Sequence, residues 1–70
     1  MSFHSTIGKE IRERRKALKI TQPEVAELAR VNINTVIRLE RGVTNPTLEV
    51  LVRIAEVLGM EVKMEVKKKG

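Results

Sequence analysis

A group of hydrogen-bonding side chains near the middle of the chain has the most specific chemistry in this sequence. Asn32, Asn34, Thr35 and Arg38 follow one another at the predicted start of a short helix. Amides and a guanidinium can form paired hydrogen bonds with base edges in the DNA major groove. A helix that projects such groups from its first turns is a geometry used to read DNA. The group therefore indicates a surface for double-stranded DNA.

The segment that must position this group is predicted to form two short helices joined by a turn. Thr21-Gln22-Pro23-Glu24 is typical of a helix start, because Thr21 and Glu24 can cap each other's backbone and proline is tolerated in the first turn. This helix is predicted to end near Ala29. The second is predicted to run from about Asn32, its cap, to Arg41. Isolated helices shorter than about 12 residues are marginal in water, so other elements must brace this pair.

One bracing helix is predicted before the pair. Ser5 or Thr6 can cap a helix that runs to about Leu18, with Ile7, Ile11 and Leu18 on one apolar stripe. Position 14 should continue that stripe, but it holds an arginine. Either Arg15 or the stem of Arg14 must therefore lie against the core.

A second bracing helix is predicted after the pair. Thr47 can cap a helix over residues 48–58, which Gly59 ends. Its predicted inward stripe consists of Leu48, Leu51, Ile54, Ala55 and Leu58. Val50, Val52 and Val57 widen the apolar face beyond the roughly 100° that one core needs. We expect some of this excess to face a second subunit.

After Gly59 the period of the pattern changes from helical to alternating. The apolar residues Met60, Val62, Met64 and Val66 alternate with charged residues, which predicts a strand with one apolar face. No other segment reads as a strand, so this one must pair with a copy from another chain or with a different protein. A helical extension or a frayed tail is the alternative.

Length and composition limit the function classes. The chain has 70 residues, no cysteine and a single histidine, His4. We therefore expect one domain with no disulfide, no metal site and no cofactor. No apolar run approaches the roughly 18 residues of a membrane span, and we expect a cytoplasmic protein.

The net charge of +5 is compatible with a polyanionic partner, and it is unevenly distributed. Residues 9–19 contain six basic and two acidic side chains, and residues 61–69 contain four lysines and two glutamates. Such runs are also typical of solvated surface. Charge by itself therefore does not decide the partner.

Linked positions along the chain resemble the Cro/C1-type helix-turn-helix family of repressors. The resemblance covers residues 6–59, leaving residues 1–5 as a flexible N-terminus and residues 60–70 as a strand and basic tail. It implies an all-α, compact bundle of four to five helices that works as a homodimer on a near-palindromic operator. The positions that carry it are Ile7-Gly8, Ile11-Arg12, Arg15-Lys16, Thr21-Gln22, Val25-Ala26, Ala29, Val31-Asn32, Thr35-Val36, Leu39-Glu40-Arg41-Gly42, Asn45-Pro46-Thr47-Leu48, Leu51, Ile54-Ala55 and Leu58-Gly59.

The resemblance also implies roles for individual residues. The side chains that would read base edges are Ile33, Asn34 and Arg38. Those that would contact the DNA backbone are Gln22, Thr35, Arg41, Thr44 and Asn45. A buried ion pair between Arg15 and Glu40 would tie the first helix to the third.

Two positions depart from the family pattern. Arg30 stands where the family commonly has glycine, and a left-handed conformation there would cost a non-glycine residue about 1 kcal/mol or more. Ile33 stands where polar readers are usual, and it can pack only on a thymine methyl. Sequence preference would then depend on Asn34 for adenine and on Arg38 for guanine.

Other function classes remain as alternatives. The strand tail is similar to that of HipB-type antitoxins, which bind a toxin protein and repress their own operon. A pure protein-interaction module would show no salt-dependent DNA binding. We do not expect an enzyme, because the chain has no aspartate, cysteine or tyrosine and offers no nucleophile with a base.

Overall fold

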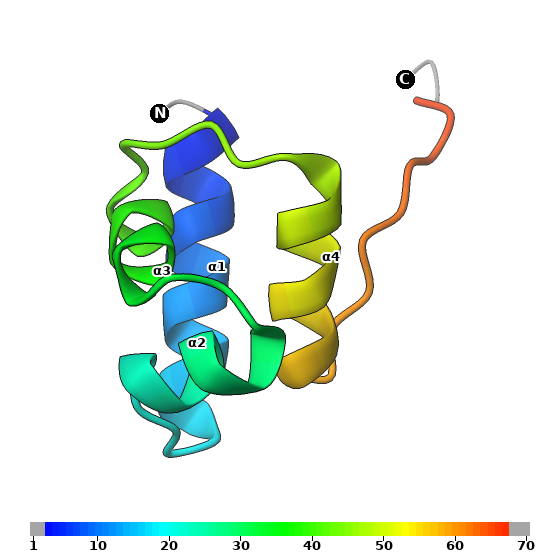
Figure 1. Ribbon diagram of the computed structural model, residues 1–70. Helices are drawn as coiled ribbons and strands as arrows, with labels where there is room; N and C mark the ends of the chain where they lie inside the picture. Colours follow the sequence, from blue (N-terminus) through cyan, green and yellow to red (C-terminus); the bar gives the residue numbers. More distant parts are fainter. Residues whose placement is uncertain (1–2, 68–70) are drawn as a thin grey trace.

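The computed structural model describes residues 3–67, and four helices form its body. They are α1 (Phe3–Ala17), α2 (Gln22–Ala29), α3 (Ile33–Arg41) and α4 (Leu48–Val57). α1 packs along α3, and α2 packs against both α3 and α4 (Figure 1). The all-α class with four helices agrees with the prediction, and α2 and α3 form the expected pair of short helices joined by a turn.

Side-chain caps explain where three of the helices begin. The Thr21 hydroxyl accepts the Glu24 N–H at 3.2 Å, and the Glu24 carboxylate accepts the Thr21 N–H at 2.9 Å. Asn32 Oδ1 accepts the Asn34 N–H at 2.8 Å at the start of α3, and Thr47 Oγ1 accepts the Val50 N–H at 3.2 Å at the start of α4. Each bond satisfies a backbone donor that has no acceptor within its helix. These are the caps that the sequence predicts.

Left-handed residues end α2 and α3. Arg30 has φ 58° and ψ 47°, so the turn between the helices needs the backbone conformation that glycine adopts most easily. Gly42 has φ 71° after α3 and fits this requirement. Arg30 does not, which makes it a strained position in the turn. Lys19, between α1 and α2, has the same φ of 58°.

The core lies where the four helices meet. Val25, Val36, Ile54 and Leu58 are completely buried, and Leu39 is almost so. The other buried apolar residues are Ile11, Ala26, Ala29 and Ala55. All four helical segments therefore contribute to the core.

Gly8 explains why α1 and α3 can lie so close together. A Cβ atom built at this position would collide with the Leu39 carbonyl oxygen and lie 3.0 Å from that of Glu40. The backbone of α3 thus occupies the space that any larger side chain would need. The sequence pattern alone did not give Gly8 this role.

Several predicted details differ from the structure. α1 begins at Phe3 rather than at a Ser5 or Thr6 cap, so residues 3–5 of the predicted flexible N-terminus are helical, and Met1 and Ser2 lie outside the described residues. Leu18 is exposed because it lies in the turn after α1 and no longer follows the helical stripe. Leu48 is 67% exposed because it begins α4 at the edge of a surface groove.

The apolar excess of α4 is partly used within the chain. Val50 and Val57 pack against the core, and Val52 is half-buried. Val50 and Val57 are therefore used in part by the core of the same chain, and the predicted contact of some of this excess with a second subunit stays a prediction.

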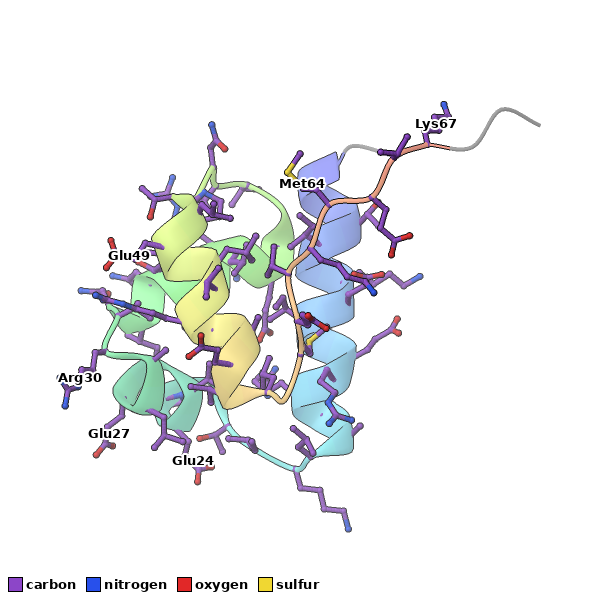
Figure 2. The ribbon with its side chains drawn as sticks, turned by 90° about the vertical axis from the view of Figure 1, so that its right-hand side faces the viewer. Glu24, Glu27, Arg30, Glu49, Met64 and Lys67 are labelled. Atoms are coloured by element: carbon purple, nitrogen blue, oxygen red, sulfur yellow. The ribbon has the colours of Figure 1, made fainter. Side chains whose placement is uncertain are left out.

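Residues 60–67 form no strand within the described chain. Met60 packs against the core, but the exposure of Met64 and Val66 is 97% and 95%. Figure 2 shows this segment running between α1 and α4 past Met64 toward Lys67. A strand requires a neighbouring strand to pair its backbone, and the described part of a single chain supplies none. The predicted pairing with another chain remains a prediction.

Candidate nucleic-acid interface

The exposed face of α3 carries the three predicted base-reading residues. Ile33 is 37% exposed, and Asn34 and Arg38 are exposed as well. The opposite face of the same helix is buried and consists of Val36, Leu39 and Glu40. Successive residues turn by about 100° around a helix, which places Asn34 and Arg38 opposite Val36 and Glu40 and leaves Ile33 at the margin of the exposed face. The structure thus presents Ile33, Asn34 and Arg38 together to solvent.

Two other polar residues near the start of α3 have different environments. Asn32 uses its side-chain oxygen to cap the helix, so this oxygen is already committed to the backbone. Thr35 is half-buried beside the exposed face, and its contact with a phosphate remains a prediction. The cap fixes the first turn of α3, and with it the direction in which Asn34 points.

A buried polar network holds α3 against α1. Arg15 Nε donates to Glu40 Oε2 at 2.6 Å, and Arg15 Nη2 donates to Glu40 Oε1 at 3.0 Å. Arg15 Nη1 also donates to the Ile20 carbonyl oxygen at 2.9 Å. The side chains of Arg15 and Glu40 are only 12% and 3% exposed. The hydrogen bond to Glu40 raises the pKa of Arg15, so the guanidinium stays charged.

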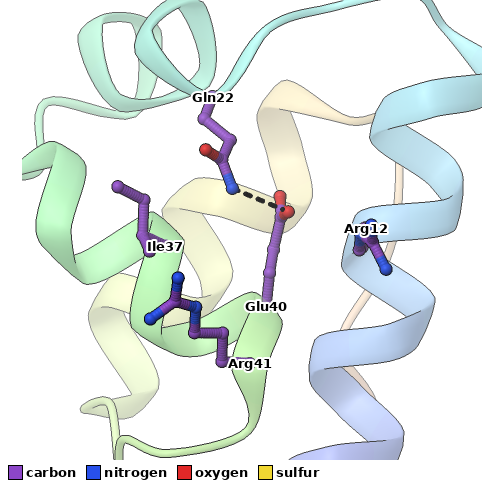
Figure 3. A pocket seen from close by; sticks show the side chains of 5 residues that line it. All are labelled: Arg12, Gln22, Ile37, Glu40 and Arg41. Carbon is purple, nitrogen blue, oxygen red and sulfur yellow. Dashed lines mark hydrogen bonds between the residues drawn. The ribbon is translucent and has the colours of Figure 1, made fainter.

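Gln22 joins this network from the start of α2. Its Nε2 donates to Glu40 Oε1 at 3.1 Å, as Figure 3 shows. Glu40 on α3 therefore binds both α1 and α2. The resemblance implied a phosphate contact for Gln22, and the structure shows that its amide also braces Glu40.

Arg14, which interrupts the apolar stripe of α1, forms a hydrogen bond with the end of α4. Its Nε donates to the Leu58 carbonyl oxygen at 2.8 Å, which satisfies a free acceptor at the end of α4. Of the two alternatives for the stripe, the structure shows the burial of Arg15, whereas Arg14 is exposed. Arg15 lies against the core, and Arg14 connects α1 to the point where the C-terminal segment leaves α4.

The predicted backbone-contacting residues lie around the far end of α3. Arg41 is its exposed last residue, and Thr44 and Asn45 follow in the loop, where Thr44 is half-buried and Asn45 is exposed. Gln22 and Arg41 come together in one cleft between α1, α2 and α3. That cleft is also lined by Arg12 and Ile37, for which the sequence predicted no individual role.

The arginines fall into two groups within residues 3–67. Arg14, Arg15 and Arg53 form hydrogen bonds or ion pairs. The side chains of Arg12, Arg30, Arg38 and Arg41 form none with any other described residue. Unpaired guanidiniums around an exposed helix face favour binding to a polyanion such as DNA.

The described part of the chain contains no group of three or more histidine, cysteine, aspartate or glutamate residues placed to hold a metal ion. None of its helices combines the length and the apolar character that crossing a membrane requires.

Comparison with protein families identifies the fold of most of the chain. Residues 11–63 match the family described as Helix-turn-helix. The matched region contains α2, α3, α4 and the C-terminal half of α1.

Individual proteins with similar sequences are named as HTH-type transcriptional regulators. The chain is 49% identical over 51 residues to an uncharacterized HTH-type transcriptional regulator of Methanothermobacter thermautotrophicus. The aligned residues cover 73% of this chain and 74% of that protein. The chain is 43% identical over 56 residues to a protein of Methanococcus maripaludis whose name describes an HTH-type transcriptional regulatory protein. That match covers 80% of this chain but only 17% of the Methanococcus protein.

A solved structure shares the fold. The clp gene regulator ClgR from Corynebacterium glutamicum superposes with a TM-score of 0.82 and 28% sequence identity. The superposition covers 86% of this chain and 64% of that one.

Proposed function

The chain belongs to the Cro/C1-type helix-turn-helix family of DNA-binding transcriptional regulators, and from this premise we propose that it is a homodimeric repressor of a near-palindromic operator. α3 enters the major groove, where Asn34 and Arg38 bind base edges and Ile33 packs on a thymine methyl. One observation carries the proposal. The exposed face of α3 presents these three side chains while its buried face is fixed by Glu40.

The same proposal assigns the DNA backbone to residues at the margin of α3. Thr35 contacts a phosphate near the start of α3, and Gln22 contacts one beside Glu40 near its end. Arg41, Thr44 and Asn45 contact phosphates at and beyond that end. Such contacts set the register of the helix in the groove without reading sequence.

We place the dimer contact on the C-terminal segment. Met60, Val62, Met64 and Val66 alternate with charged residues, and the last two are almost fully exposed. Pairing of this segment with its copy in a second chain would satisfy its backbone and cover these side chains. The dimer would then present two copies of α3 about 34 Å apart, one turn of DNA.

The proposal is tested by selecting bound sequences from random duplex DNA at two salt concentrations. We expect two related half-sites with centres about 10 base pairs apart, and binding that weakens steeply with salt. Selection of a single half-site would contradict the symmetric dimer. Failure to select any sequence would contradict base reading.

The dimer contact has its own test, the deletion of residues 60–70. We expect the shortened chain to sediment as a monomer and to lose operator affinity, because single half-site binding forgoes the second set of contacts. A shortened chain that still sediments as a dimer would rule out this segment as the main contact.

A second candidate function follows from the same exposed apolar segment. Met64 and Val66 can be covered by a toxin protein instead of a second copy, which would make the chain an antitoxin that also represses its own operon. Copurification of a stoichiometric partner protein from the native host would favour this function over a free repressor.

A further inference from the structure

A cleft beside the exposed face of α3 has the composition of an anion site. It lies between α1, the start of α2 and the end of α3, and Figure 3 shows Arg12 and Arg41 on opposite sides of Glu40. We propose that this cleft binds one phosphate of the DNA backbone between the guanidiniums of Arg12 and Arg41. The inference rests on the proposed function and adds α1 to the DNA-contacting surface.

The acidic residue in the cleft does not oppose an anion. Glu40 is the only acidic side chain of the lining, and its two oxygens accept two hydrogen bonds from Arg15 and one from Gln22. Its charge is compensated by Arg15, and its oxygens are already engaged. The cleft therefore keeps the positive charges of Arg12 and Arg41.

Neither flanking arginine is used inside the described part of the chain. Both side chains are exposed and form no ion pair or hydrogen bond with residues 3–67. Elsewhere on the surface, Lys9 pairs with Glu13 at 4.0 Å and Arg53 pairs with Glu49 at 2.7 Å. A guanidinium presents several donors in one plane and matches phosphate geometry well.

The position of the cleft fits a DNA backbone beside the major groove. Arg41 follows Arg38 by one helical turn on α3, so a phosphate at Arg41 lies next to the bases that Arg38 reads. Arg12 precedes Arg15 by the same interval on α1, and the Arg15–Glu40 pair fixes α1 against α3. The backbones that carry the two arginines are thus held in place by packed helices, which favours a preformed site.

The test measures how binding to random-sequence duplex DNA depends on salt. Arg12→Gln should lower the slope of log affinity against log salt by about 0.9, the contribution of one phosphate contact. The ratio of the DNA affinity of the unaltered protein to that of Arg12→Gln should therefore fall by about 3.5-fold between about 50 and 200 mM salt. Arg53→Gln is the matched control, since it removes the same charge from α4 and should leave the slope unchanged.

A double variant tests whether the two arginines share one phosphate. If both guanidiniums are needed to hold that phosphate, Arg12→Gln combined with Arg41→Gln should lower the slope by about 0.9, as either change does alone, rather than by twice that amount. Arg12→Lys should restore the slope, because it keeps the charge, but only part of the affinity. Additive slopes would overturn the shared site.

The outcomes separate this inference from the proposed function. If Arg12→Gln and Arg53→Gln behave alike while the unaltered protein binds DNA, the cleft takes no phosphate and the proposed function stands. If the unaltered protein shows no salt-dependent DNA binding, the proposed function itself fails. Equal melting temperatures of the variants exclude unfolding as the cause of any loss.

Discussion

The guanidinium of Arg15 and the carboxylate of Glu40 form a two-point ion pair that joins α1 to α3, with bonds of 2.6 and 3.0 Å. Both side chains are largely removed from solvent, and Gln22 adds a third bond to the same carboxylate. The residues on the outer face of α3 can read DNA only while its inner face is held in this position. The pair is therefore a structural requirement for the interface, although it is not itself exposed to DNA.

The first prediction concerns the cost of breaking this pair. Glu40→Ala leaves the charge of Arg15 buried without a partner, and we expect the free energy of unfolding to fall by about 3–5 kcal/mol. Urea unfolding followed by circular dichroism measures this change. Glu49→Ala is the control, because its pair with Arg53 is exposed and should contribute only about 0.3–0.5 kcal/mol. An unchanged midpoint for Glu40→Ala would contradict the role of the pair.

The second prediction concerns the contact between α1 and α3 at Gly8. Helix propensity alone would make Gly8→Ala stabilising by about 1 kcal/mol. Because the new Cβ would collide with the Leu39 carbonyl oxygen, we expect instead a loss of about 1–3 kcal/mol. Thermal unfolding decides between the two signs. Lys9→Ala, at the next and exposed position of α1, should change stability little.

The third prediction concerns the strained turn at Arg30. Glycine adopts the left-handed conformation of this position without the roughly 1–2 kcal/mol cost that a side chain adds. It also gives the unfolded chain more conformational entropy, which lowers the stability of the fold by about 0.4–1 kcal/mol. We therefore expect Arg30→Gly to raise stability by up to about 1 kcal/mol. Arg30→Ala keeps the Cβ atom and should give no such gain. Equal effects of the two changes would show that strain at this position is negligible.

The fourth prediction concerns base reading by α3. Arg38→Ala should weaken binding to the selected operator by about 1–3 kcal/mol and relax preference at one base pair per half-site. Fluorescence anisotropy with the operator and with its single-base variants measures both effects. Arg53→Ala removes an arginine from α4 and should leave the preference intact. If Arg38→Ala weakens operator and random DNA equally, Arg38 contacts the backbone and not a base.

The fifth prediction concerns acid and the cap of α2. The Thr21 N–H, and then its hydroxyl, lower the pKa of Glu24 below its ordinary 4.5. A lowered pKa in the folded state means that the ionised cap stabilises the fold above the unfolded-state pKa and that this contribution is lost as the pH falls through the folded-state pKa.

Glu24→Gln isolates this effect, because glutamine can form the same cap but does not titrate. We expect the variant to be less stable than the unaltered protein at about pH 6, and the difference to disappear as the pH falls through the folded-state pKa of Glu24. Unfolding midpoints measured from about pH 6 downward test this. A difference between the two proteins that does not change with pH would rule out ionisation as the source of the cap's contribution.

Local signals in the sequence were sufficient to predict where the helices around the interface begin. The capping residues Thr21, Asn32 and Thr47 act on backbone groups two or three positions away, so their effect is visible in the sequence itself. Helical periodicity likewise identified most of the core. It failed at Leu18 and Leu48, which lie at helix ends, where neighbouring elements rather than spacing decide exposure.

What the sequence determined by itself was the set of four helices and the residue types on the outer face of α3, because both depend on contacts within a few positions of the chain. The tertiary structure alone decided the close approach at Gly8, the bond from Arg14 to the end of α4 and the cleft between Arg12 and Arg41. Each of these joins residues more than 25 positions apart. Such distances are fixed by how the helices pack around their shared core, which no local pattern specifies.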